Sequence, residues 1–101
     1  MLIYNVTTKV THSIHTKWLE WMKEKHIPEV MASGCFISQR LVRLLDTDES
    51  DGVTYAAQYE VDNKELYDIY IEQHAPALRK DMMNTFGDQF ISFRSLMEVV
   101  N

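Results

Sequence analysis

The sequence predicts an α+β fold in which one antiparallel sheet carries helices on a single face. Three observations lead to this fold: four strand-length segments with alternating polarity, two helical segments between them, and a pair of motifs that occurs in both halves of the chain. With 101 residues, 46% apolar and 25% charged, the chain has the size and composition of one folded domain, residues 1–101.

The first half of the chain is predicted to form a strand, a helix and a strand. Residues 2–10 alternate between apolar and more polar positions, as in a half-buried strand. Ser13 is expected to cap a helix that runs to Ala32, and Gly34 suits the left-handed turn that ends it. Residues 35–45 are again typical of a strand.

The second half repeats this order after an acidic stretch, DTDESDG at residues 46–52, which is expected to be an exposed hairpin loop. Residues 53–61 form the third predicted strand. Asp62 and Glu65 make an acidic variant of the capping box, which opens a long helix that reaches Phe86 and stops at Gly87. The last strand covers residues 90–100, so the predicted order is βαββαβ.

The repeated motifs indicate an internal pseudo-twofold. In each half, a His-x-Pro motif precedes a strand that begins Phe-Ile-Ser and contains an arginine. Two βαβ units with right-handed crossovers make a ferredoxin-like sheet with both helices on one face. The motifs are His26-Ile27-Pro28 with Phe36-Ile37-Ser38-Gln39-Arg40, and His74-Ala75-Pro76 with Phe90-Ile91-Ser92-Phe93-Arg94.

Alternation along the strands assigns two faces to the sheet. The face expected to take the helices is almost wholly apolar: Leu2, Tyr4, Val6, Ile37, Leu41, Leu45, Tyr55, Ala57, Tyr59, Ile91, Phe93, Met97 and Val99. The opposite face mixes polar and large apolar side chains: Asn5, Thr7, Phe36, Ser38, Arg40, Val42, Leu44, Thr54, Gln58, Phe90, Ser92, Arg94, Leu96 and Glu98. A large apolar patch on an open face indicates a partner surface, so we expect a homodimer with two sheets packed face to face around a polar lumen. A monomer with an open sheet is the alternative.

Composition narrows the partners and the location. The formal charge of −5, without a basic run, argues against nucleic acid. No apolar stretch exceeds strand length and no export signal precedes Leu2, so neither a membrane segment nor secretion is expected. Cys35 is the only cysteine, which excludes an internal disulfide, suits the cytoplasm and predicts a small buried residue. His15 and His26 lie about 16 Å apart along a helix, too far to share an ion, so no metal site is predicted. No bound cofactor is expected either.

A family resemblance rests on four stretches of the chain: Tyr4-Asn5-Val6, Trp18-Leu19-Glu20-Trp21-Met22, His26-Ile27-Pro28-Glu29-Val30-Met31 and Gly34-Cys35-Phe36. They resemble a domain-of-unknown-function family of short bacterial proteins in the dimeric α/β-barrel superfamily, alongside antibiotic-biosynthesis-type monooxygenases, haem-degrading oxygenases and muconolactone-isomerase-like enzymes. The resemblance implies a ferredoxin-like fold and a face-to-face dimer. Asn5 and His74 match positions that bracket the substrate in haem-degrading members. The tryptophan of that group is absent, which argues against haem; the residues in its place are Leu66, Tyr67 and Tyr70.

Two histidines are candidates for proton transfer. A proline two residues after each of them removes a backbone donor, so His26 and His74 are expected at breaks between helical segments. There an imidazole either caps free carbonyl groups or acts as a general base beside a cavity.

The remaining candidates would bind a ligand. A pocket wall or plain core packing is expected from Trp18, Met22, Tyr55 and Tyr59. Arg40 and Arg94 occupy equivalent places in the two repeats, where they would hold a carboxylate or pair with Glu60 or Glu98. Asn5 would add a neutral hydrogen bond.

The sequence favours a non-catalytic homodimeric binding or scaffold module. The alternative is a small-molecule enzyme, monooxygenase-like or isomerase-like, that acts on a small aromatic or acidic compound without a tightly bound cofactor. An open pocket beside His26 would favour the enzyme. A filled core with both ring nitrogens bonded to the backbone would favour the module.

Overall fold

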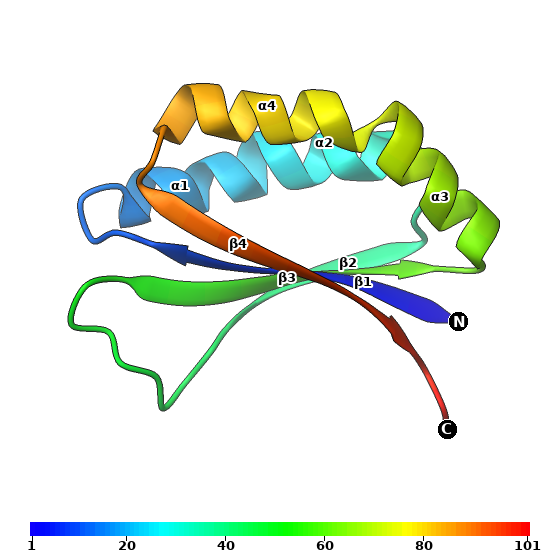
Figure 1. Cartoon of the computed structure of the whole chain (residues 1–101), viewed down its shortest axis with the longest axis horizontal. Helices are drawn as coiled ribbons and strands as arrows, with labels where there is room; N and C mark the ends of the chain where they lie inside the picture. Colours follow the sequence, from blue (N-terminus) through cyan, green and yellow to red (C-terminus); the bar gives the residue numbers. More distant parts are fainter.

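The computed structural model describes residues 1–101 and has four strands and five helical segments (Figure 1). The strands are β1 (Leu2–Val10), β2 (Ser38–Arg43), β3 (Val53–Val61) and β4 (Phe90–Glu98). The helical segments are α1 (His15–Trp21), the π-helical segment η1 (Met22–His26), α2 (Ile27–Ala32), α3 (Lys64–Gln73) and α4 (Ala75–Phe86). The predicted βαββαβ order is confirmed. None of the helices is both long and apolar enough to cross a membrane.

The four strands form one antiparallel sheet in the order β2-β3-β1-β4. All helical segments lie on one side of this sheet, and the other side is uncovered (Figure 1). This arrangement is the predicted ferredoxin-like α+β fold. The two strands that lead into the helices, β1 and β3, occupy the centre of the sheet.

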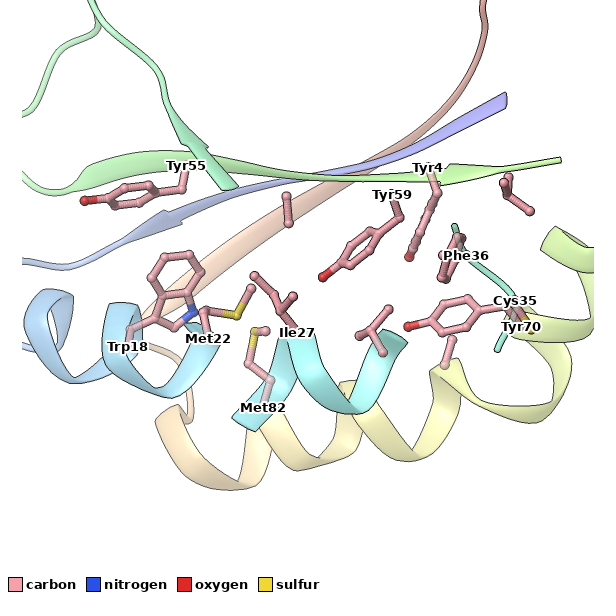
Figure 2. Close-up of a cluster of buried hydrophobic side chains, with 14 of the residues drawn as sticks. Tyr4, Trp18, Met22, Ile27, Cys35, Phe36, Tyr55, Tyr59, Tyr70 and Met82 are labelled. Carbon is pink, nitrogen blue, oxygen red and sulfur yellow. The ribbon is translucent and has the colours of Figure 1, made fainter. Parts of the chain in front are cut away.

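The hydrophobic core lies between the sheet and the helices. Its 16 buried residues come from every layer of the fold, and Cys35 is among them, as predicted. Aromatic rings dominate one end, where Phe36 packs against Tyr4, Tyr59 and Tyr70 with centroid distances of 6.0, 5.2 and 4.7 Å (Figure 2). These rings join the central strands to α3.

The predicted faces are correct for β1, β2 and β3, but wrong for β4. Residues directly opposite in an antiparallel sheet share a face, and Val6 lies opposite both Ala57 of β3 and Arg94 of β4. The residues of β4 that face the helices are therefore Phe90, Ser92, Arg94 and Leu96, and those on the open face are Ile91, Phe93, Ser95 and Met97. The start of this strand is apolar at both parities, so alternation alone does not decide its orientation.

This register also removes the predicted equivalence of the two arginines. Arg40 is on the open face, opposite Gln58, whereas Arg94 is on the helix face. Phe36 was expected on the open face but precedes β2 and is buried under the helices. Ile37 and Leu45 were expected on the helix face but lie outside β2 and are exposed.

Two predicted helix starts are wrong by one residue, while both predicted glycine stops are confirmed. The Ser13 side chain does not cap α1 and bonds neighbouring side chains instead. Asn63, rather than Asp62, caps α3 by accepting a backbone N–H bond of 2.9 Å. Gly34 and Gly87 have φ angles of 76° and 62°, the region that glycine adopts without steric cost.

Candidate functional site

The two His-x-Pro motifs take different conformations. At His74 the φ angle is −118° and the predicted break occurs, visible as the bend between α3 and α4 in Figure 1. At His26 the predicted boundary between helical segments is present, since η1 ends at His26 and α2 begins at Ile27, but the predicted departure from helical geometry is wrong, because Ile27 keeps helical angles of −61° and −45°. Here the helix widens into η1, in which the Ile27 N–H bonds the Met22 carbonyl five residues back. This wider turn accommodates Pro28, which has no N–H to offer.

The π-helical segment aligns four side chains at four-residue spacing. In an α-helix each four-residue step advances about 40°, so such a row would turn by about 120° over twelve residues. The wider i→i+5 turns of η1 rotate less per residue than an α-helix. This smaller rotation keeps the four side chains on the same side of the helix. As a result the same cavity is lined by Trp18, Met22, His26 and Val30. Single-turn π segments of this kind are frequent at functional sites.

The cavity has a volume of about 400 Å³ and lies between the helix face of the sheet and the helices. Of its 18 lining residues, 13 are hydrophobic, which is typical of small-molecule sites. Figure 2 shows Trp18, Met22, Tyr59 and Met82 extending into the space between the two layers. The lining residues are Tyr4, Val6, Thr8, Trp18, Met22, His26, Val30, Ala57, Tyr59, Tyr70, Leu78, Arg79, Met82, Met83, Phe90, Ile91, Ser92 and Arg94.

His26 lines this cavity and has a buried ring nitrogen without a hydrogen-bond partner. Its Nδ1 is buried and has no hydrogen-bond partner, while the Trp21 ring stacks on the imidazole with a centroid distance of 5.0 Å. Burial lowers the pKa of His26 from 6.5 to about 4, outweighing the opposite effect of Glu29 and Asp81. The ring is therefore neutral at pH 7.

The indole of Trp18 is the second polar group without a partner. Its Nε1 is buried and donates to no acceptor within the chain. An unpaired buried polar group costs about 1–3 kcal/mol, and the two residues that carry such a nitrogen line the same cavity. Burial raises the pKa of Tyr59 and of Tyr70, so these phenols remain neutral at the same wall.

Two arginines complete the polar part of the lining. Arg79 of α4 donates from Nη2 to the Tyr4 hydroxyl at 3.3 Å, and Arg94 extends from β4. Thr8 and Ser92 bond each other at 2.8 Å on the sheet. The sequence analysis did not single out Arg79. The spacing of Ala75, Leu78, Arg79 and Met82 on the predicted helix was the available signal.

Asn5 and Arg40 lie on the opposite, open face of the sheet. Arg40 Nε donates to Gln58 Oε1 at 2.9 Å, and Gln58 Nε2 donates to Asn5 Oδ1 at 3.2 Å. Asn5 Nδ2 continues the row to Thr7 Oγ1 at 3.0 Å. This row crosses β2, β3 and β1 and is separated from the cavity by the sheet. Arg40 therefore bonds an amide rather than either predicted glutamate.

Two other predicted residues also lie outside the cavity. Tyr55 donates to or accepts from His15 Nε2 at 2.7 Å and packs against Trp18. His74 stacks on Tyr70 with a centroid distance of 6.1 Å. Of the residues predicted from sequence, the structure brings together His26, Trp18, Met22, Tyr59 and Arg94 and leaves out His74, Asn5, Arg40 and Tyr55.

Solved structures with the same fold cover almost the whole chain. An antibiotic biosynthesis monooxygenase is similar with a TM-score of 0.68 and 15% identity, covering 100% of both chains. SnoaB, a cofactor-independent oxygenase from Streptomyces nogalater, has a TM-score of 0.64 and 10% identity, covering 99% of this chain and 94% of its own. A dimeric ferredoxin-like protein from an uncultured marine organism has a TM-score of 0.68 and 12% identity, covering 99% and 96%. At these identities the similarity establishes the fold.

No curated protein matches the sequence. Residues 1–100, nearly the whole chain, match one protein family, in agreement with the resemblance seen in the sequence. The chain belongs to the family described as "Domain of unknown function (DUF4286)".

Proposed function

We propose that the chain binds a small aromatic compound in the cavity and transfers a proton on it, with His26 as the general base. The observation that carries this proposal is the position of His26 in the lining of the cavity, together with its buried Nδ1, which has no hydrogen-bond partner in the chain. A general base needs a free lone pair within reach of the substrate, and a His capping a helix end lacks one.

The proposed step uses only groups of this chain. Nδ1 of His26 takes a proton from an acidic C–H bond of the ligand, and the electron pair left behind delocalises into its aromatic or carbonyl system. Donors on the cavity wall, the Trp18 N–H and the Tyr59 hydroxyl, stabilise the oxygen on which charge develops. Return of the proton to another carbon gives an isomer, so no oxidant or cofactor is consumed. The fold likeness to a cofactor-independent oxygenase supports such a site in this architecture.

Hydrogen–deuterium exchange at C1 of 2-tetralone, followed by ¹H NMR in D₂O, tests the proposal. General-base catalysis typically contributes about 10²–10⁴-fold, so we expect the protein to accelerate exchange by at least about 10²-fold over buffer. His26→Gln should return the rate to that of buffer. His12→Gln is the matched control, because His12 is exposed, bonds the Glu49 carbonyl and does not line the cavity. Equal rates for His26→Gln and the unmodified protein would exclude His26 as the base.

Ligand binding without turnover is the second candidate function. It is favoured by the absence of Asp and Glu from the cavity lining, which leaves His26 as the only candidate base there, with a pKa lowered by burial to about 4. Saturable binding of 2-tetralone without accelerated exchange would support this function over the first.

We also propose that the chain forms a homodimer through the open face of its sheet. Support comes from the exposed apolar side chains on that face, which include Phe93 at 65% and Ile91 at 56% exposure. A dimeric ferredoxin-like protein of the same fold is consistent with this arrangement. Face-to-face packing would bury these side chains together with the row from Arg40 to Thr7.

A further inference from the structure

We infer that the natural ligand is an aromatic carboxylate, whose anionic group Arg79 and Arg94 bind at the edge of the cavity between α4 and β4. This inference rests on the proposed binding function and specifies the class of compound that the cavity selects.

The charge of the cavity is opposite to that of the chain. The protein has 15 acidic and 10 basic residues and a net charge of −5. The cavity lining nevertheless contains two arginines and a histidine, and no aspartate or glutamate. A lining that contains two guanidinium groups and no carboxylate attracts an anion, even in an acidic protein.

Both guanidinium groups are available to a ligand. Neither arginine belongs to any of the five ion pairs of the chain, whereas Arg43, for comparison, binds Glu49 with two nitrogens. Arg79 has one hydrogen bond, to the neutral hydroxyl of Tyr4, which anchors the side chain and leaves its other N–H groups free. A guanidinium carries five donors in a planar fork that matches a carboxylate.

The rest of the lining fits an aromatic body. Both arginines are largely exposed, so they lie where the cavity meets solvent, while Trp18 and Met82 are buried in its interior. Three methionines, Met22, Met82 and Met83, line the wall and adapt to flat rings of different shape. A volume of about 400 Å³ is near the lower end of small-molecule sites. The polar edge and apolar interior together select a compact ring system with a charged end.

The test compares two probes of the same shape, 2-naphthoate and 2-naphthamide, by isothermal titration calorimetry at pH 7.5. We expect the protein to bind the carboxylate at least about tenfold more tightly, because hydrogen bonds between two charged groups are stronger than those to a neutral amide. Arg79→Gln and Arg94→Gln should each weaken naphthoate by about tenfold and leave naphthamide within about twofold. Arg94→Lys, which keeps the charge, should recover part of the loss.

Lys80→Gln is the control for net charge, since Lys80 is exposed on α4 next to Arg79 but does not line the cavity. It should leave both affinities unchanged. Equal binding of the two probes, no binding of naphthoate, or an equal loss for Lys80→Gln would overturn the inference. Tight, arginine-dependent naphthoate binding without tetralone exchange would retain it while rejecting the proton-transfer proposal.

Discussion

His26 lies in an environment that favours the neutral imidazole. Its Nδ1 is buried, the Trp21 ring covers one face, and Lys25 lies 5.8 Å from the centroid of that indole. The charged groups around the imidazole oppose one another, because Glu29 and Asp81 favour protonation whereas Lys25 and Arg94 disfavour it. Desolvation decides the balance, so protonation of this residue and folding compete.

This competition predicts a pH-dependent stability. The pKa of His26 falls from 6.5 to about 4 on folding, so the unfolded chain binds more protons between these values. The free energy of unfolding should therefore decrease as pH falls through this range, by on the order of 3 kcal/mol from this residue. Urea unfolding of the unmodified protein and of His26→Gln at pH 7 and pH 4.5 measures it, because carboxylate titration is common to both. Parallel pH dependences would show that His26 is not desolvated.

At the scale of elements, the π-helical segment determines which side chains reach the cavity. Trp18 of α1 and Val30 of α2 are both almost fully buried, with 1% exposure each. Twelve residues of uninterrupted α-helix would turn one of them away from the sheet by about 120°. The wider turn of η1 allows both Trp18 and Val30 to face the core, and it places His26 on the same side of the helix. The helix therefore departs from α geometry in η1, the segment that contains His26, the candidate base.

Deletion of Glu24, an exposed residue within η1, tests this account. Without the extra residue the segment becomes α-helical, and the eleven residues then left between Trp18 and Val30 correspond to about three turns, so both side chains can remain in the core. We expect this deletion, like the substitution Glu24→Ala, to change the free energy of unfolding measured in urea by less than about 1 kcal/mol. Insertion of one alanine after Glu24 would instead turn Val30 by about a further 100° and should cost about 2–4 kcal/mol, because burial of one large side chain is lost. A deletion as costly as the insertion would contradict the role assigned to the π turn.

The molecule as a whole has one covered and one uncovered sheet face. Its helix face holds the core and the cavity, while β4 presents Ile91, Phe93 and Met97 on the other side. Val42 of β2 adds a further exposed apolar side chain at the opposite edge. The exposed apolar side chains of β4, with Val42 at the other edge of the sheet, match the proposed interface between two copies.

Phe93→Glu should therefore convert a dimer into a monomer. In sedimentation experiments at micromolar concentration, the unmodified chain is expected at twice its mass of 11.9 kDa and the variant at 11.9 kDa. A glutamate at this position would be buried without a counter-charge in the interface. Leu45→Glu makes the same chemical change in the loop after β2, at a side chain that is 77% exposed, and should leave the dimer intact. A monomeric unmodified protein, or a dimeric Phe93→Glu variant, would reject the proposed interface.

Local patterns in the sequence were sufficient for the element order, the two glycine stops and the family. Strands β1 and β3 begin and end at the predicted residues, because polarity alternates through each of them and turn residues bound them. The orientation of β4 was not predictable in this way, since its apolar residues occur at both parities and only pairing with β1 determines which of them face the core.

The composition of the site could not be predicted from local patterns either. Tyr4 and Arg79 are 75 residues apart and meet only in the folded chain, where the cavity admits His26 and excludes His74. The periodicity of polar and apolar side chains specifies local structure. The register between strands and the assembly of the site residues depend on contacts between distant segments.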